Sequence, residues 1–410
     1  MVLAGGQGQR LYPLTKDRAK PAVPFGGVYR IIDFSLSNCL NSGLRRICVL
    51  TQYKSESLDR HIRFGWSVFN PEIGEWIETR PPQQRMSSDW YLGTADAIYQ
   101  NIYTLEGERP RCVLILGGDH IYRMDYARML QAHVRNNADL TIACTEKPLA
   151  EAAGRLGVLT AGEDMRVSLF QEKPAYPEPM GGRTDMCLCS MGIYVFNTEV
   201  LVRRVIDDAK RESSHDFGRD VVPAMVQKGD RIFAYQFTGH YWRDIGTLDA
   251  YWEAHMDLIS IQPAFNLYDA EWPIRGVRHC HAPAKIVFGA GAGASPKSEV
   301  YNSLISNGAI VSGAYVCDSI IGTDVRVEVG ARIERSVILD RTKVGRGAHI
   351  RRAIIDKDNV IPDNARVGVD PDWDRRHFSV SEGGIAVMAK GVPFPGFGAG
   401  TTAPAGKPLD

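Results

Sequence analysis

The chain has no excess of charge of either sign. Its 410 residues include 48 lysines and arginines and 48 aspartates and glutamates, so the formal net charge at pH 7 is zero. A balanced charge provides no long-range attraction to nucleic acid or to an anionic membrane, and neither is expected as a partner. Any site for an anion must therefore be local.

Long apolar runs and paired cysteines are also lacking. No stretch approaches the ~20 apolar residues that a membrane-spanning helix needs, and no charged segment with an apolar core opens the chain. The eight cysteines are scattered, the closest pair being Cys187 and Cys189, and no CxxC spacing suggests zinc or a dithiol site. This usage is typical of reduced, buried thiols, so we expect a cytoplasmic protein.

Two sequence patterns divide the chain. From residue 1 to 262, short apolar runs alternate with amphipathic stretches, which predicts an α/β domain of the Rossmann-like kind with a mostly parallel sheet. Strands are expected at 45–50, 112–117, 139–144, 166–171 and 192–196, and helices at 33–42, 95–105, 125–136, 198–208 and 247–259. Motifs at the carboxyl ends of such strands would meet in one crevice.

A repeat follows Pro263. The segments "NSLIS" (302–306), "DSIIG" (318–322), "RSVIL" (335–339) and "RAIID" (352–356) recur at intervals of 16, 17 and 17 residues, with single aliphatic residues six apart between them. Three hexapeptide sides per turn predict a left-handed parallel β-helix over 297–388, joined through a linker at 263–296. Antiparallel hairpins are the alternative. The Gly- and Pro-rich residues 389–410 are expected to be a disordered tail.

The opening stretch "LAGGQGQRL" (3–11) has glycines at 5, 6 and 8. Without side chains there, the backbone can approach a triphosphate and direct N–H groups toward it. The stretch is neither a Walker A motif nor GxGxxG, and for the glycines alone a tight turn is the alternative. Arg10 and Lys20 add two cations, and Pro21 restricts the residue before it to extended geometry, which would hold Lys20 in place.

Two carboxylates from distant segments are expected at the same crevice. Asp119 follows the apolar run "CVLILG", and Asp244 lies in "YWRDIG". Two carboxylates around one hard cation suit Mg²⁺ on a triphosphate, although Asp119 could instead cap a turn. We do not expect His120 to act as a general base, because a phosphate oxygen is already anionic at neutral pH; a structural hydrogen bond is expected instead.

The segment "QEKP" (171–174) again places a lysine before a proline. This arrangement suits a site in which Lys173 clamps a sugar phosphate while Glu172 accepts hydrogen bonds from sugar hydroxyls. A solvated Glu–Lys pair is the alternative.

Several motifs, in order along the chain, resemble one family. The segments "LAGGQGQRL" and "RAKPAVPFGG" resemble the signature of sugar-nucleotide pyrophosphorylases. Together with "WYLGTADAIYQN", "GGDHIYRMDY", "EKPAYP", "SMGIYVF", "SHDFGRD" and "YWRDIGTLDAYW", they make the chain similar to the bacterial ADP-glucose pyrophosphorylases from Val2 to about Ile385. The resemblance implies synthesis of ADP-glucose and pyrophosphate from ATP and α-D-glucose 1-phosphate for glycogen, by a homotetramer with small-molecule allosteric effectors.

The resemblance also implies site residues. Arg10 would bind the leaving phosphates, Lys20 would bear on the α-phosphorus, and Asp119 and Asp244 would hold Mg²⁺. The implied nucleotide contacts are Leu3, Ala4, Gly5, Gly6, Gly8, Gln52, Gly93 and Thr94. The implied glucose 1-phosphate contacts are Tyr91, Gly157, Glu172, Lys173 and Ser190, and the candidate effector-binding cations are Arg18, Arg30, Arg351, Arg352 and Arg376.

Two alternatives stay open: a transferase that uses UTP or dTTP, and a non-catalytic regulatory subunit. The motifs "WYLGTADA" and "SHDFGRD" argue against the first, and the presence of Arg10, Lys20, Asp119 and Lys173 in one chain argues against the second. Asp17 and Pro24 stand where relatives activated by sugar bisphosphates commonly carry a lysine and a histidine. We therefore expect weak activation by fructose 1,6-bisphosphate.

Overall fold

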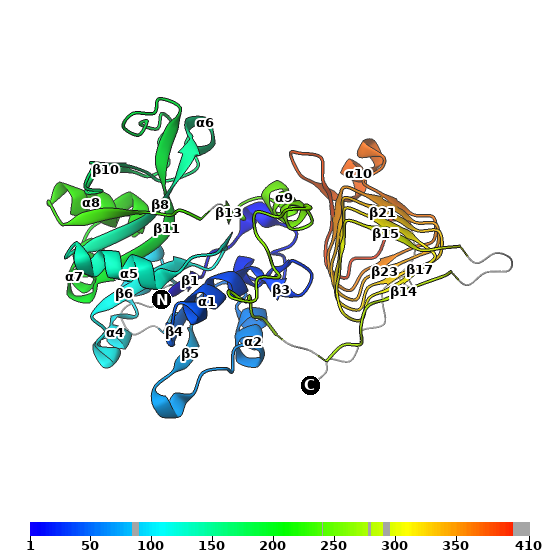
Figure 1. Ribbon diagram of the computed structural model, residues 1–410, viewed down its shortest axis with the longest axis horizontal. Helices are drawn as coiled ribbons and strands as arrows, with labels where there is room; N and C mark the ends of the chain where they lie inside the picture. Colours follow the sequence, from blue (N-terminus) through cyan, green and yellow to red (C-terminus); the bar gives the residue numbers. More distant parts are fainter. Residues whose placement is uncertain (84–89, 240, 278–279, 290–295, 397–410) are drawn as a thin grey trace.

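The structure is a computed structural model that describes residues 1–83, 90–239, 241–277, 280–289 and 296–396. An α/β domain and a prism of short stacked strands lie side by side (Figure 1). No helix within these ranges is long and apolar enough to cross a membrane.

A nine-stranded mixed sheet forms the centre of the α/β domain. Its strands are β1 (Val2–Ala4), β4 (Arg46–Thr51), β5 (Trp76–Arg80), β6 (Cys112–Gly117), β8 (Leu140–Pro148), β9 (Val158–Ala161), β10 (Val167–Gln171), β11 (Met186–Asn197) and β12 (Ile232–Gln236). The order is β10-β9-β11-β6-β1-β4-β5, with β8 beside β11 and β12 beside β8. β5, β4, β1 and β6 run parallel, whereas β11 runs antiparallel to β6 and β8.

Strand β1 has three residues and still lies at the centre of the sheet. Leu3 pairs with Leu50 of β4 on one side and Gly117 of β6 on the other. Because these strands are parallel, the segments that follow Ala4, Thr51 and Gly117 all leave the sheet at one edge.

Helices cover both faces of this sheet (Figure 1). The helices are α1 (Ile31–Asn41), α2 (Glu56–Gly65), α3 (Thr94–Tyr99), α4 (Ile102–Glu108), α5 (Tyr126–Arg135), α6 (Leu149–Ala152), α7 (Thr198–Ala209), α8 (Val222–Gln227) and α9 (Leu248–Leu258). Apolar residues of α3, α4, α7 and α8 share one buried cluster, and those of α1, α2 and α5 share a second. The single helix expected at 95–105 is two helices, because the chain turns at Gln100 and Asn101.

The second body is the expected β-helix. Its first sheet contains β14 (Lys285–Val287), β17 (Ile310–Ser312), β20 (Arg326–Val327), β23 (Lys343–Val344) and β26 (Val360–Ile361). The second contains β15 (Glu299–Tyr301), β18 (Tyr315–Cys317), β21 (Arg332–Glu334), β24 (His349–Arg351) and β27 (Arg366–Val367). The third contains β16 (Leu304–Ile305), β19 (Ile320–Ile321), β22 (Val337–Ile338), β25 (Ala353–Ile355), β29 (Ala386–Met388) and β28 (Ser379–Val380). Neighbouring coils pair in parallel, as in a left-handed β-helix, and only β28 runs antiparallel among these described pairs.

Two described segments bear on the expected domain limits. Strand β14 lies within the range expected to be a linker, and its Ile286 pairs with Val311 of the next coil. At the other end, Phe394 is buried and its ring lies 5.8 Å from that of Trp373 in α10 (Pro371–His377). The first residues of the expected tail are thus packed, since one aromatic side chain finds a partner; residues 397–410 lie outside the described ranges.

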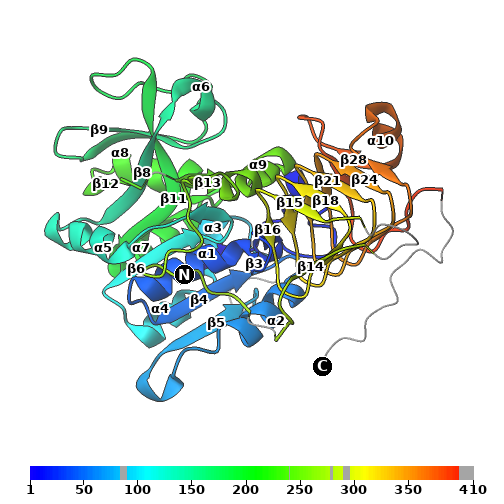
Figure 2. The same ribbon diagram turned by 45° about the vertical axis from the view of Figure 1, so that its right-hand side comes forward.

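The third sheet of the β-helix packs on the α/β domain (Figure 2). One buried cluster joins residues from both bodies, including Leu14, Phe25, Tyr251, Val337 and Ile354. Residues of the β-hairpin formed by β2 (Pro24–Phe25) and β3 (Tyr29–Arg30) belong to the same interface. Apolar residues of the segment between β1 and α1, such as Leu14 and Phe25, therefore pack in one cluster with the β-helix.

Candidate active site

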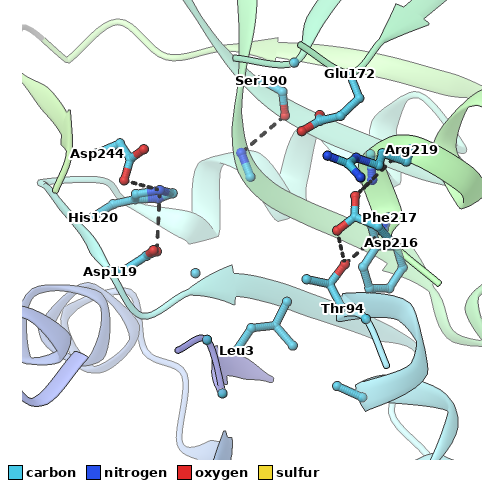
Figure 3. Close-up of a pocket in the computed structure, with 18 of the residues that line it drawn as sticks. Leu3, Thr94, Asp119, His120, Glu172, Ser190, Asp216, Phe217, Arg219 and Asp244 are labelled. Atoms are coloured by element: carbon cyan, nitrogen blue, oxygen red, sulfur yellow. Dashed lines mark hydrogen bonds and ion pairs between the residues drawn. The ribbon is translucent and has the colours of Figure 1, made fainter. Parts of the chain in front are cut away.

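A cavity of about 730 Å³ opens at the edge of the sheet where β1, β4 and β6 end (Figure 3). Most residues expected at the site line it: Leu3, Gly5, Gly6, Arg10, Lys20, Gln52, Tyr91, Gly93, Thr94, Asp119, Gly157, Glu172, Lys173, Ser190 and Asp244. Ala4 and Gly8 do not line it. Ala4 is buried in β1, where its side chain packs in the sheet.

The three glycines of the opening loop lack a side chain for different structural reasons. Gly8 has a φ of +63°, in the left-handed region, and a Cβ there would lie 3.0 Å from both Lys20 Cβ and Thr15 Cγ2. A Cβ on Gly5 would lie 3.1 Å from Gln52 Cβ, whereas one on Gly6 would meet nothing within 4 Å. Gly8 therefore shapes the turn and Gly5 permits packing, while Gly6 leaves open space in the cavity.

Lys20 joins the two carboxylates expected at the metal. Its Nζ donates to Asp119 Oδ2 at 2.7 Å and to Asp244 Oδ1 at 3.3 Å. The lysine side chain is 11% exposed, and the two carboxylates are about one-third exposed. Asp244 reaches this point because β13 (Trp242–Asp244) pairs with β7 (His120–Tyr122), which sets Asp244 opposite His120.

The backbone at Lys20 differs from the expectation. Lys20 begins the short 3₁₀ helix η2 (Lys20–Ala22), whose turns are closed by hydrogen bonds from Ala22 N to Ala19 O and from Val23 N to Lys20 O. The extended conformation predicted from Pro21 was wrong, because this buried turn overrides the local preference. Lys20 is nonetheless held, through its burial and its two ion pairs.

Charges at this end of the cavity reinforce one another. Burial alone would lower the pKa of Lys20, but the ion pairs with Asp119 and Asp244 outweigh it, and the pKa is raised. Burial opposes ionisation of Asp119, yet Lys20 and His120 hold the pKa of that carboxyl well below its usual range. The site therefore contains a protonated lysine and an ionised carboxylate at neutral pH.

His120 lies between the same carboxylates. Its Nε2 is 3.5 Å from Asp119 Oδ1 and 3.8 Å from Asp244 Oδ1, and its ring lies edge-on to Trp242 at 5.3 Å. The Nδ1 atom is buried and has no hydrogen-bond partner among the described residues. In place of the expected structural hydrogen bond, the His120 ring has two longer contacts with carboxylate oxygens and a contact with the ring of Trp242.

The donor set fits a divalent cation. One ligand atom each from Asp119, His120 and Asp244 lies within 4.8 Å of the others. Two carboxylate oxygens are the kind of ligand that hard cations prefer. The same carboxylates accept hydrogen bonds from the ammonium of Lys20.

A second cluster forms around Glu172. Its Oε1 lies 2.7 Å from Lys173 Nζ, and Ser190 is held nearby through a bond from its N–H to Gly157 O at 2.8 Å. A Cβ on Gly157 would lie 2.9 Å from Glu172 Oε2, and one on Gly218 only 2.5 Å from it. Two bare glycines therefore make room for this carboxylate, which faces the cavity in Figure 3.

Lys173 has a φ of +50°, in the left-handed region that lysine rarely adopts, although a residue before proline favours extended backbone. Such a conformation costs of the order of 1–3 kcal/mol and often occurs at binding sites. The side chain is 47% exposed and thus available to an anion.

The described segment around residue 91 is fixed by Gln52. The Oε1 atom of Gln52 accepts from Tyr91 N at 2.9 Å, and its Nε2 donates to Tyr91 O at 3.4 Å. The Tyr91 hydroxyl accepts from Asn101 Nδ2 at 2.9 Å and donates to Arg80 O at 3.3 Å. Gln52 and Tyr91 therefore shape the wall of the cavity with groups that already have partners.

Comparisons with known proteins agree with this geometry. The family model described as "Nucleotidyl transferase" matches residues 1–261, and the one described as "GlmU-like, C-terminal hexapeptide" matches residues 282–388. A glucose-1-phosphate adenylyltransferase from Rhodopirellula baltica is 49% identical, with 95% of this chain and 89% of that protein aligned. The chain belongs to the glucose-1-phosphate adenylyltransferase family.

Two further relatives carry the same name. Glucose-1-phosphate adenylyltransferase 2 from Vibrio cholerae is 48% identical over 96% of this chain and 98% of its own length. The enzyme from Shewanella baltica strain OS185 is 48% identical over 95% and 94%. The family recognised from the sequence motifs is thus confirmed, as is the pairing of a nucleotidyltransferase domain with a hexapeptide β-helix.

Sequence reasoning left several cavity residues of this family member without a role. Asp216 accepts from Thr94 Oγ1 at 3.0 Å and from Gly218 N at 2.9 Å, so it links α3 to the π-helical turn η4 (Phe217–Val221). Arg155 and Arg219 also line the cavity. The motif "SHDFGRD" contained Asp216 and Arg219, but the partner Thr94 lies 122 residues away.

Arg10 lies at the metal end of the cavity. A Cβ on Gly246 would lie 3.4 Å from Arg10 Nη2 and 3.3 Å from Asp244 Oδ2, so the guanidinium is beside that carboxylate. In the part of the chain that the structure describes, the side chains of Arg10, Arg155 and Arg219 form no hydrogen bond or ion pair within the protein. These cations are free to meet an anionic ligand.

The candidate effector cations are differently placed. Arg18 is buried in an ion pair with Asp356, and Arg30 Nη1 donates to Ser57 O at 2.6 Å. Burial lowers the pKa of Arg30 to about 10. Lys357 lies at the same domain boundary and was not identified from the sequence. Burial lowers the pKa of this lysine, and Arg30 and Arg18 lower it further, whereas Asp340 raises it.

The other three candidates are exposed. Arg352 donates from Nη2 to Gly383 O at 2.8 Å and lies 5.5 Å above the ring of Trp252. Arg376 donates from Nε to Asp372 O at 3.1 Å within α10. Arg351 is exposed on β24.

Proposed function

We propose that the chain is a glucose-1-phosphate adenylyltransferase, which forms ADP-glucose and pyrophosphate from ATP and α-D-glucose 1-phosphate and supplies glucosyl units for glycogen. The observation that carries the proposal is the meeting of Lys20, Asp119 and Asp244 beside the glycine loop, in one cavity with Glu172 and Lys173. The names of the relatives support it, over 95% or more of the chain.

The proposed reaction is an in-line displacement at phosphorus. A phosphate oxygen of glucose 1-phosphate attacks the α-phosphorus of ATP, and the bond from the α-phosphorus to the bridging oxygen breaks, so pyrophosphate leaves. No proton needs to be removed from the attacking oxygen at neutral pH. The protein contributes positioning and charge stabilisation, which are the main sources of rate in phosphoryl transfer.

Each cation has a proposed part. Lys20 stabilises charge at the α-phosphorus, and Arg10, whose guanidinium has no ion pair with the described residues, binds the departing β- and γ-phosphates. The phosphates offer the Lys20 ammonium new anionic partners, and it leaves Asp119 and Asp244 to take them. Lys20 thus acts as a counter-ion before ATP binds and as a catalytic group afterwards.

We assign Mg²⁺ to Asp119 and Asp244. Their hard carboxylate oxygens fit this cation, and when bound it would neutralise charge on the triphosphate. The glucose 1-phosphate end is assigned to Lys173 for the phosphate and to Glu172 and Ser190 for the sugar. Gln52, Gly93 and Thr94 form the wall proposed to meet the adenine.

A nucleotide panel tests the proposal. The purified chain is incubated with glucose 1-phosphate, Mg²⁺ and one of ATP, UTP or dTTP, and pyrophosphate and the sugar nucleotide are both quantified. We expect kcat/KM for ATP to exceed that for the others by about tenfold or more, as site contacts discriminate between bases. Preference for UTP or dTTP would favour the alternative transferase, and no turnover with any nucleotide would favour a regulatory subunit.

Assembly, regulation and location form a second part of the proposal. We propose a cytoplasmic homotetramer in which effectors bind where the two domains meet. All eight cysteines lie in described ranges as free thiols, which supports a reducing compartment. At the boundary, Arg18 is paired with Asp356 and Lys357 with Asp340, so we propose that Arg30, which donates to Ser57 O, is the cation that meets the anion.

Asp17 is exposed beside this boundary. Its negative charge opposes a bisphosphate, so we expect weak activation by fructose 1,6-bisphosphate and a stronger response in Asp17→Lys. A screen of glycolytic intermediates, AMP and phosphate, together with light scattering for the molar mass, tests effectors and assembly. Submillimolar activation of the unaltered chain by the bisphosphate would contradict this expectation.

A further inference from the structure

A buried ion pair connects the β-helix to the segment that carries Lys20. Both Nη1 and Nη2 of Arg18 donate to Asp356 Oδ1 at 3.1 Å, and Nη2 also donates to Asp356 Oδ2 at 2.9 Å. The two side chains are 7% and 1% exposed. Arg18 lies two residues before Lys20, whereas Asp356 directly follows β25 of the β-helix.

Asp356 is fixed within the β-helix by several bonds. Its N–H donates to Met388 O at 3.0 Å, and its carbonyl oxygen accepts from Asn359 Nδ2 at 2.7 Å and Thr342 Oγ1 at 3.2 Å. Its Oδ1 also accepts from Lys357 N at 2.7 Å. The backbone of Asp356 is therefore tied to neighbouring coils, and its carboxylate is oriented by the next residue.

Besides the ion pairs of Lys20 itself, other bonds hold the segment before it. Ala19 N donates to Lys54 O at 3.3 Å, and the Lys54 ammonium donates to the carbonyl oxygens of Thr15 and Lys16. On both sides of this stretch, Leu14 and Phe25 belong to the cluster that packs on the third sheet of the β-helix. The β-helix thus supports the loop before, at and after Arg18.

A role in stability alone explains this pair poorly. Burying two charges costs solvation that their attraction repays only in part, so an apolar pair often serves stability as well or better. Burial raises the pKa of Asp356 even though Arg18 lies beside it, as expected when desolvation is substantial. The bidentate contact instead fixes the orientation of the Arg18 side chain, because two guanidinium nitrogens bind the same carboxylate.

We propose that Asp356 is a positioning residue for Lys20. Through Arg18, the β-helix sets the position of the lysine ammonium relative to the reacting phosphates. Its kinetic part rests on the proposed function. The β-helix then forms part of the active-site scaffold, since its carboxylate fixes a residue two positions from the catalytic lysine. A misplacement of about 1 Å at such a group lowers the rate by about a hundredfold.

Two variants separate positioning from stability. Asp356→Asn weakens the bidentate contact, and the double variant Arg18→Met with Asp356→Leu removes both charges so that neither is left buried alone. We expect kcat to fall by about tenfold to a hundredfold in both, with KM for ATP and glucose 1-phosphate changed less than about threefold. The melting temperature of the double variant should lie at or above that of Asp356→Asn.

A matched control is the pair formed by Arg204 and Asp230. Arg204 Nη2 donates to Asp230 Oδ1 at 2.5 Å and Nε to Oδ2 at 2.8 Å, and both side chains are 12% exposed. Neither residue lines the cavity. Asp230→Asn should lower the melting temperature and leave kcat per folded molecule unchanged.

A second readout does not depend on turnover. The rate of Lys20 acylation by acetic anhydride is followed by peptide mass spectrometry, with the exposed Lys16 as an internal reference. Loss of the Arg18 anchor should raise the Lys20 rate several-fold relative to Lys16, and Asp230→Asn should not. This readout tests the positioning even if the chain proves not to be an adenylyltransferase.

The outcomes are distinct. A folded double variant with unaltered kcat and an unaltered Lys20 acylation rate would overturn the proposal. If Asp356→Asn does not fold, kcat and the Lys20 acylation rate are compared with the unaltered chain in the double variant and in Arg18→Lys. The second of these keeps a positive charge opposite Asp356. Lower kcat without faster acylation of Lys20 would also count against it, because the effect would then bypass the lysine.

Discussion

The ammonium of Lys20 lies 2.7 Å from the Oδ2 atom of Asp119, although the two residues are 99 positions apart. The bond joins the cation proposed to act at the α-phosphorus to a carboxylate proposed to hold the metal. Because this contact raises the pKa of Lys20 and holds that of Asp119 low, both groups stay charged over the ordinary working range of pH.

Lys20→Ala should lower kcat by about 10²–10³, the loss found when one preorganised donor to a transition state is removed. The variant should fold, because Asp119 and Asp244 remain about one-third exposed and can be solvated. Steady-state kinetics and a melting curve check both points. Lys16→Ala, at an exposed lysine of the same loop, is the control; wild-type turnover in folded Lys20→Ala would refute the assignment.

Asp119→Asn and Asp244→Asn should each raise the Mg²⁺ concentration for half-maximal rate, by about tenfold or more. Each change removes one hard anionic ligand while keeping the side-chain shape. Titration of the initial rate with Mg²⁺ at fixed free ATP measures the shift. Asp185→Asn, at an exposed carboxylate, should leave the titration unchanged. An unaltered Mg²⁺ dependence in both site variants would exclude the pairing.

The elements around this site were largely predictable because they depend on local patterns. The run at 112–117 is β6, and the repeat at 302–356 supplies strands of the β-helix. The single helix expected at 95–105 is two helices, since the turn at Asn101 accompanies a side-chain bond to the Tyr91 hydroxyl that the apolar pattern does not reveal.

The site shows the same division. Lys20, Asp119 and Asp244 were identified from residue type and position, and they do converge. The backbone at Lys20 was not predictable, because its turn is buried. The ion pair between Arg18 and Asp356 was not predictable either. The partners are 338 residues apart, and nothing in the sequence around one of them indicates the other.

Lys173→Ala should raise KM for glucose 1-phosphate by about tenfold, with a smaller change in KM for ATP. The phosphate of glucose 1-phosphate carries its charge before the reaction begins, so a contact with Lys173 is already made in the ground state and its loss shows in KM. Lys173→Arg keeps the charge and should recover part of the affinity. A rise confined to the ATP KM would move Lys173 to the other substrate.

Gly218→Ala tests whether the Glu172 carboxylate must stay where the two glycines leave room for it. The added methyl group would lie 2.5 Å from Glu172 Oε2 and 3.0 Å from its Cδ, which is closer than atoms in contact can approach. The carboxylate must therefore shift from its place in the cavity lining, where the sugar is proposed to bind. We expect KM for glucose 1-phosphate to rise by about tenfold or more while KM for ATP changes little.

The control for this substitution is Gly181→Ala, because a Cβ at that glycine meets nothing within 4 Å. Gly218 has no positive φ, so alanine introduces no backbone strain there and the effect comes from the contact with Glu172. The double variant Gly218→Ala with Glu172→Ala should then be no worse than Glu172→Ala alone, since the displaced carboxylate is gone. Additive losses in the double variant would show that Gly218 acts on the sugar site independently of Glu172.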